Sequence, residues 1–137
     1  MMRIVIDKNA FMPTRAYETD AGLDLYSPID ITVPARGSAI IDTGVHVQLP
    51  KGTAGMIKSK SGLNVKHNLT SEGVVDVGYT SSMVIKLYNH GDMDYQVRRG
   101  DKISQLVLVQ IVTPHLMVVD KLDDSERGEN GFGSTGR

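Results

Sequence analysis

The sequence contains no cysteine, which excludes disulfide bonds and zinc sites built on thiolate ligands. It also lacks an apolar run of membrane-spanning length, and its first residues, MMRIVIDKNA, lack the apolar core of a signal peptide. The absence of thiols fits a reducing compartment. We therefore expect a cytoplasmic protein that does not act at a membrane.

An excess of charge of either sign is absent as well. The 137 residues include 15 Lys and Arg and 16 Asp and Glu, which gives a formal net charge of −1. Since no overall electrostatic field favours nucleic acid, we expect no nucleic-acid partner. Any anionic ligand must therefore be bound by groups that gather locally.

Several well-known catalytic signatures are missing too. The sequence has no G-x-S-x-G elbow, no P-loop and no Rossmann fingerprint. Its histidines are scattered and form no metal-ligand spacing such as HExxH: His46, His67, His90 and His115. Any catalytic site must therefore be built from other combinations of residues.

The residues that are present form short runs rich in valine and isoleucine, separated by turns that contain glycine, proline or aspartate. This rhythm predicts an all-β sandwich or barrel, and a chain of 137 residues is most simply one domain. Only one short helix is expected, over SGLNVKHNL (61–69). The β-type runs include RIVI (3–6), LDLYS (23–27), DITVPA (30–35), SAIIDTGVHVQLP (38–50), TAGMIKSK (53–60), SMVIKLYNH (82–90) and ISQLVLVQIV (103–112).

The stretch KSKSGLN (58–64) is a candidate anion site. Ser61 and Gly62 open the expected helix, where backbone N–H groups favour negative charge, and Lys60 adds a cation. The alternative is that Ser61 only caps the helix while Lys58 and Lys60 are solvated. The stretch taken alone favours this second interpretation.

The stretch GVVDVGY (73–79) is a candidate catalytic segment. Asp76 lies between Val75 and Val77, where a carboxylate is costly unless it has polar partners. With a reference pKa of about 3.9, an aspartate is ionised at neutral pH and can accept a proton from water. Tyr79 supplies a flat apolar face nearby. The alternatives, a turn-capping Asp76 and a core or rim Tyr79, stay open at this point.

Three further stretches are ambiguous by themselves. AGLDLYS (21–27) places Asp24 within an apolar strand. GDKISQL (100–106) is most simply interpreted as a turn followed by a strand, with Gln105 exposed. The C-terminal RGENGFGSTGR (127–137) has almost no hydrophobic residue, which is typical of a disordered tail. Yet this tail carries a guanidinium, an aromatic ring and two hydroxyls.

In sequence order, AGLDLYS, KSKSGLN, GVVDVGY, GDKISQL and RGENGFGSTG resemble the five motifs of the trimeric dUTPase family. The last is the most specific, because only Asn130 departs from a family pattern close to RGxGGFGSTG. The resemblance implies a jelly-roll β fold, a homotrimer, and Mg²⁺-dependent hydrolysis of dUTP to dUMP and pyrophosphate. It also implies a β domain of residues 1–126 and an arm of residues 127–137 that closes over a neighbouring chain's active site.

The resemblance also implies a role for each matching residue. Asp76 would activate the water that attacks the α-phosphorus, and Asp24 would reach Mg²⁺ through water. Tyr79 would pack beneath the deoxyribose, and the backbone of the third motif would pair with the uracil edge. The arm would be disordered without substrate and closed when substrate is bound. The residues expected to bind substrate are Lys60, Ser61, Gly62, Gly73, Val74, Val75, Tyr79, Val84, Gln105, Arg127, Phe132, Gly133, Ser134 and Thr135.

The chain departs from the family pattern at a few positions. Lys60 stands where the second motif usually has Arg, so bidentate phosphate contact is in doubt there. The third motif often reads I-D-x-D-Y-R-G-E, whereas here Gly78 replaces the second acid and residues 80–82 are Thr-Ser-Ser. Asp76 and Tyr79 are retained, so we expect the chemistry to be retained as well.

Two other classes of function are compatible with such a fold. A dCTP deaminase would need a catalytic Glu to handle the exocyclic amine. A non-catalytic binding or regulatory module would be expected to lose Asp76 or the arm. The sequence keeps Asp76 beside Tyr79 and keeps the arm, which favours the pyrophosphatase.

Overall fold

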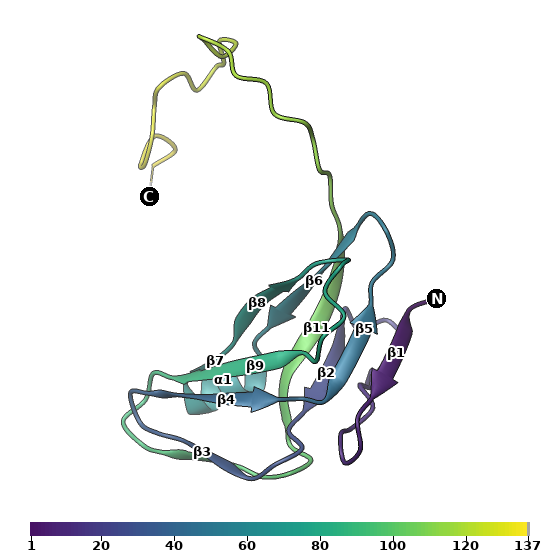
Figure 1. Cartoon of the computed structure of the whole chain (residues 1–137). Coiled ribbons are helices and arrows are strands. Elements are labelled where there is room, and N and C mark those ends of the chain that lie inside the picture. The colour runs from purple at the N-terminus through teal and green to yellow at the C-terminus, as the bar shows by residue number, and fades with distance from the viewer. Residues whose placement is uncertain (137) are drawn as a thin grey trace.

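A computed structural model describes residues 1–136, and Arg137 of the predicted arm lies outside the described residues. It shows a β-rich body from which the C-terminal segment extends (Figure 1). The described residues form strands and one short helix, which confirms the predicted all-β class. The elements are β1 (Arg3–Ile6), β2 (Gly22–Tyr26), β3 (Ile31–Val33), β4 (Ser38–Asp42), β5 (Val45–Gln48), β6 (Thr53–Lys58), α1 (Ser61–His67), β7 (Leu69–Thr70), β8 (Glu72–Val75), β9 (Val84–Asn89), β10 (Tyr95–Val97) and β11 (Lys102–Gln110).

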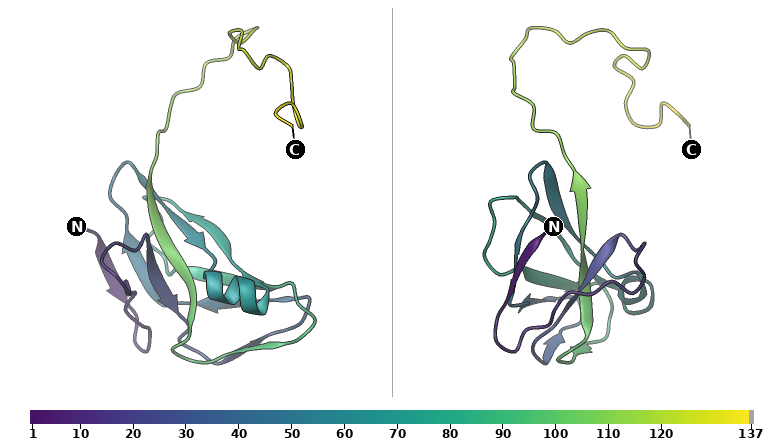
Figure 2. Two further views of the ribbon diagram at one scale, coloured as in Figure 1. Left: turned by 180° about the vertical axis from the view of Figure 1, so that it is seen from behind. Right: turned by 90° about the vertical axis from the view of Figure 1, so that its right-hand side faces the viewer.

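The strands pair in two larger sheets and two separate pairs. One sheet has the order β2-β11-β6-β8 and the other the order β4-β9-β7, while β1 pairs with β5 and β3 with β10. All of these pairings are antiparallel. Figure 2 shows α1 on the outside of the body, and none of its side chains is buried.

The core follows from strand alternation. In β9, Ile85 and Leu87 are buried, whereas Val84, Lys86 and Tyr88 point outward. Because successive side chains of a strand point to opposite faces, such a strand has one buried and one exposed face. The core residues with the least exposure include Leu25, Val33, Ile41, Val45, Leu69, Met83, Ile85, Leu87, Val97, Ile103 and Leu106.

The predicted run over residues 38–50 is wrong as a single strand. The structure ends β4 at Asp42, starts β5 at Val45, and places the two strands in different sheets. Gly44 lies between them with a φ of 67°, a conformation that favours glycine. A Cβ at Gly44 would lie 2.8 Å from the Ala10 Cβ, so the break also depends on close packing.

The helix and the short strands refine the sequence prediction. Helix α1 ends at His67 rather than at residue 69, because Asn68 adopts the left-handed conformation and its N–H bonds back to the carbonyl groups of Asn64 and Leu63. Leu69 then begins β7 and is buried. The short strands β7, β8 and β10 were not among the predicted runs.

The chain leaves the body after β11. Its last backbone hydrogen bond to the body joins the Ile111 N–H to the Gly52 carbonyl at 3.0 Å. Figures 1 and 2 show the following segment extending away from the body in every view. The division into residues 1–126 and 127–137 stays a prediction, although the extended segment already starts after Ile111. None of the helices in residues 1–136 is long and apolar enough to span a membrane.

Candidate active site

The first group of predicted site residues lies in one row across the sheet β2-β11-β6. Gln105 of β11 is opposite Asp24 of β2 on one side and opposite Lys58 of β6 on the other. Neighbouring strands lie about 4.8 Å apart, so this register brings the first, second and fourth motifs together. Gly22 makes the row possible, since a Cβ there would lie 2.1 Å from the Gln105 side-chain oxygen.

Asp24 is a buried carboxylate held by two ammonium groups. Only 4% of the residue is exposed; Lys60 Nζ contacts one carboxylate oxygen and Lys102 Nζ lies 2.9 Å from the other. Burial opposes ionisation, but hydrogen bonds from the two lysines outweigh it and hold the pKa of Asp24 below its ordinary value. The alternative of a solvated Lys60 is therefore wrong. Lys102, which the sequence interpretation missed, lies in the quoted stretch GDKISQL.

The second motif continues this group toward helix α1. Ser61 and Gly62 are both exposed at the start of α1, and a Cβ at Gly62 would meet nothing within 4 Å. The N-cap position is Lys60, which makes no side-chain capping bond, so the alternative in which Ser61 caps the helix is wrong. Lys58 pairs with Glu72 at 3.1 Å. The Gln105 side chain donates a hydrogen bond of 2.9 Å to the Ser59 carbonyl.

The second group surrounds a pocket of about 260 Å³ between β8 and β9. Strand β8 is the edge of its sheet and pairs only with β6, so part of its backbone N–H and C=O groups stays unpaired in the sheet. The pocket therefore offers both apolar walls and backbone donors and acceptors. Its lining contains Gly73, Val74, Val75, Tyr79 and Val84, all predicted to bind substrate, together with Ile57 and Met83.

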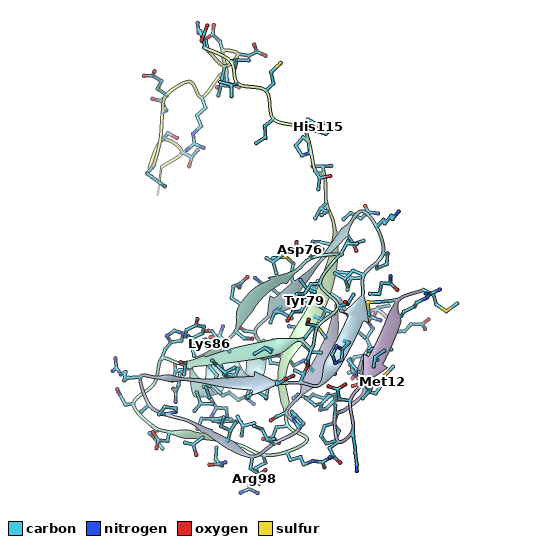
Figure 3. The ribbon with its side chains drawn as sticks, in the orientation of Figure 1. Met12, Asp76, Tyr79, Lys86, Arg98 and His115 are labelled. Carbon is cyan, nitrogen blue, oxygen red and sulfur yellow. The ribbon has the colours of Figure 1, made fainter. Side chains whose placement is uncertain are left out.

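Asp76 directly follows β8 beside this pocket. The residue is exposed, so its carboxylate does not bear the desolvation cost that the apolar neighbours in the sequence suggested. The Tyr79 N–H donates to the Asp76 carbonyl at 3.0 Å, and the Tyr79 hydroxyl donates to the Ser82 carbonyl at 2.9 Å. The Tyr79 residue is 43% exposed, as a rim aromatic would be. Figure 3 shows Asp76 and Tyr79 at the end of the body from which the C-terminal segment leaves.

The third group lies in the C-terminal arm. Arg127 Nε donates to the Asn130 carbonyl at 2.8 Å, and another of its nitrogens donates to the Gly131 carbonyl at 3.0 Å. Phe132 is fully exposed. Among the described residues, every hydrogen bond and ion pair formed beyond Ile111 stays within residues 112–136. The predicted arm residues therefore meet one another, and not the other two groups.

The first two groups adjoin along β6, but Lys60 and Asp76 lie toward opposite ends of the β6–β8 pair. Lys58 is opposite Glu72 and Gly55 is opposite Val75 in the β6–β8 pair. Lys60 thus lies beyond one end of this pair and Asp76 beyond the other, a separation of roughly 20 Å along the strands. One chain therefore places Lys60 and Asp76 far apart, and no hydrogen bond among the described residues joins its arm to either of them.

The first group contains one carboxylate, Asp24, that could serve a magnesium ion. Among residues 1–136, no group of three or more His, Cys, Asp or Glu side chains could hold a metal. Both Asp24 oxygens already contact lysine ammonium groups. This arrangement fits a contact to Mg²⁺ through water, with the metal bound mainly by its phosphate ligand, rather than direct ligation.

The model of the dUTPase family matches residues 8–136. The chain belongs to the dUTPase family.

Individual members of the dUTPase family resemble the chain over nearly its whole length. The deoxyuridine 5'-triphosphate nucleotidohydrolase of Eremothecium gossypii is 48% identical over 131 residues, which are 94% of this chain and 86% of that protein. The solved dUTPase of Staphylococcus bacteriophage 80alpha with dUPNHPP gives a TM-score of 0.90 at 32% identity, covering 100% of this chain and 99% of the phage chain. These likenesses confirm the jelly-roll-like dUTPase fold.

A second solved dUTPase bears on the metal. The variant enzyme from phage phi11 of S. aureus, whose structure shows the coordination of a structural Mg(II) ion, gives a TM-score of 0.82 at 30% identity. It covers 88% of this chain and 97% of the phage chain. A metal ion is therefore compatible with this dUTPase fold.

Proposed function

We propose that this member of the dUTPase family hydrolyses dUTP to dUMP and pyrophosphate. The observation that carries the proposal is the pocket between β8 and β9, which has Asp76 beside it, in a chain that matches the dUTPase family over residues 8–136. In this pocket, unpaired backbone groups of β8 pair with the uracil edge, and Tyr79 packs beneath the deoxyribose. Cytosine would leave donors facing donors, at a cost of about 1–3 kcal/mol for each unsatisfied group.

Asp76 acts as the general base. Its carboxylate accepts a proton from water while the water oxygen bonds to the α-phosphorus. The bond from that phosphorus to the bridging oxygen breaks, so pyrophosphate leaves and the proton passes from Asp76 to solvent. The exposed position of Asp76 supports this role only when a bound nucleotide and the arm exclude bulk water.

The triphosphate is bound by the first group and the arm. Lys60 and Gln105 supply a cation and an amide donor, and the exposed Ser61 and Gly62 supply a hydroxyl and an unobstructed backbone N–H. Mg²⁺ carried by the triphosphate, with Asp24 reaching it through water, would neutralise charge on the phosphate oxygens. The arm contacts the γ-phosphate and covers the base through Arg127, Phe132, Gly133, Ser134 and Thr135.

A homotrimer with shared active sites would assemble the three groups. The separation of Lys60 from Asp76 and the departure of the arm from its own body both support this arrangement. The extended segment that leads from β11 to the arm exposes apolar side chains that a neighbouring chain would cover, as apolar patches on a subunit surface commonly are. These side chains include Val112, Leu116, Met117, Val118 and Leu122.

The substrate is tested by measuring pyrophosphate release with Mg²⁺ from dUTP, dCTP, dTTP and UTP. We expect turnover of dUTP at least about 100-fold faster than of dCTP, since a buried mismatch of two polar groups costs several kcal/mol. UTP and dTTP share the pairing edge of dUTP, so they should be slower because of the 2′-hydroxyl above Tyr79 and the added 5-methyl group. Equal rates on all four nucleotides would contradict the proposal. Ammonia release from dCTP would identify a deaminase instead, and binding of dUTP without turnover would identify a non-catalytic module.

A further inference from the structure

The loop between Asp76 and Val84 is held by contacts from strands outside its own hairpin. Its end is tied to β5, because the Met83 N–H donates to the Val45 carbonyl at 2.8 Å. Its middle contacts His46, which is also on β5 and has a half-buried side chain. Two of the loop residues that depart from the family pattern make further contacts, Thr80 through its backbone carbonyl and Ser82 through its hydroxyl.

His46 joins this loop to the end of β1. Its Nδ1 lies 2.9 Å from the Thr80 carbonyl oxygen, and its Nε2 lies 3.1 Å from a carboxylate oxygen of Asp7. A carbonyl and a carboxylate oxygen both accept hydrogen bonds. This pair of acceptors suits the protonated imidazolium, in which both ring nitrogens donate.

A second contact fixes the same loop next to Tyr79. The Ser82 hydroxyl donates to Asp42 Oδ1 on β4, and Asp42 also accepts a hydrogen bond of 3.0 Å from the Gly44 N–H. The Ser82 carbonyl in turn accepts the Tyr79 hydroxyl. The Tyr79 ring is thus positioned by a chain of contacts in which Thr80 and Ser82 are both tied to other strands.

We propose that protonated His46 is a positioning residue, which fixes the loop of residues 76–83 and thereby the Tyr79 ring in the nucleotide pocket. His46 touches neither substrate nor reacting atoms. The inference rests on the proposed function for its effect on turnover, but the loop contacts themselves do not depend on that function.

The charges around His46 favour its protonated form. The groups facing it from packed elements are Asp7 at the end of β1, Asp42 on β4 and Arg3 on β1, which lines the same cavity. The Thr80 carbonyl, followed by the Asp7 carboxylate, raises the pKa of His46 above its ordinary value of 6.5. A raised pKa means that the contact is complete at acidic pH and is lost as pH rises through the pKa of the folded protein.

The first test uses NMR on the full-length protein and needs no turnover. Between about pH 5 and 9, we expect the Tyr79 ring signals to titrate with the same midpoint as His46, above 6.5. His46→Gln should abolish this titration of Tyr79, and Asp7→Asn should move the midpoint of His46 to lower pH. The proposal would be overturned if the Tyr79 ring signals did not change with pH, or if they still titrated in His46→Gln.

The second test compares kcat/KM for dUTP of the wild type and His46→Gln across pH. We expect a loss of about 2- to 5-fold near pH 6, the size of an exposed charged contact, and a ratio near 1 above about pH 9. The control is His90→Gln. His90 bonds the Thr70 hydroxyl at 2.7 Å, and because a hydroxyl can donate or accept, this contact does not require a protonated ring. The control should therefore show no loss that depends on pH. A loss that is the same at every pH would overturn the positioning role. Failure of the wild type to hydrolyse dUTP while the NMR titration holds would instead overturn the proposed function.

Discussion

At the scale of single residues, Asp24 combines burial with charge. A carboxylate that is 4% exposed would be strongly disfavoured in isolation, and Lys60 and Lys102 offset that cost with direct contacts. Both lysine side chains are partly exposed, so their ammonium groups hold the buried carboxylate from the protein surface. Asp24 therefore fixes two cations of the proposed triphosphate site in place before any ligand arrives.

Replacing Asp24 with Asn should destabilise the protein by about 1–3 kcal/mol at pH 7, because it leaves two lysines beside a neutral group. The lowered pKa of Asp24 means that this stability is present above the ordinary pKa and is lost as pH falls through the folded value. The difference between wild type and variant should therefore shrink in acid. Urea unfolding at about pH 7 and pH 3 measures it.

Glu72→Gln is the matched control for Asp24→Asn, since it breaks the ion pair with Lys58 in which both side chains are exposed. It should cost less than about 1 kcal/mol at either pH. Equal losses for the two variants would show that burial of Asp24 contributes nothing to its pairing.

At the scale of elements, the local pattern of apolar and polar residues predicted a strand well where one face is buried and the other is exposed to solvent. The runs that contain β4 and β9 have this alternation, and β1 alternates between half-buried and exposed residues. It could not predict the two-residue β7 or the three-residue β10, which are too short to show a period and form only by pairing with β9 and β3. Nor did it show the change of sheet at Gly44, which depends on contact with Ala10.

The candidate site shows the same limit. Motif order pointed to Gly73, Tyr79 and Val84, and the structure gathers them around one pocket. The sequence could not show that Asp76 is far from Lys60, because that distance is set by the register of β6 on β8. It also could not show the contact of His46 with Thr80, since β5 and the loop are distant along the chain.

Strand β6 has no room for an added methyl group at Gly55. A Cβ there would lie 2.7 Å from Leu106 Cδ1 and 3.2 Å from the Val75 Cβ, which belong to the strands on both sides. Gly55→Ala should therefore cost about 1–3 kcal/mol through overpacking, measured by chemical unfolding. Gly78→Ala is the control, because its Cβ would meet nothing within 4 Å and should change stability by less than about 0.5 kcal/mol. Equal stability of the two variants would contradict the tight packing of β6.

At the scale of the whole molecule, the three groups of site residues predict complementation between inactive chains. An Asp76→Asn chain lacks the base, and a chain truncated after Glu126 lacks the arm, so each alone should be inactive. If base and arm come from different subunits, equal mixing should restore about a quarter of the wild-type sites, since each of the two positions is filled correctly in half of the cases.

The two chains are unfolded together in urea, refolded, and assayed for pyrophosphate release. The control replaces the Asp76→Asn chain with one that carries both defects, and this mixture should stay inactive. A mixture of the two single-defect chains that stays inactive, although trimers containing both are recovered, would show that each chain completes its own site.

The exposed ring of Phe132 is a suitable position for a fluorescent probe of the arm. The chain contains no tryptophan, so Phe132→Trp would place the protein's sole indole on the segment that is proposed to cover the base. Its emission in the free protein should be that of an indole in water, and a non-hydrolysable dUTP analogue should shift it to shorter wavelength as water is removed. Unchanged emission at saturating analogue would mean that the arm does not close. Recorded in a stopped-flow instrument, the same shift would time arm closure and reopening against pyrophosphate release, and so show whether chemistry or the arm limits each turnover.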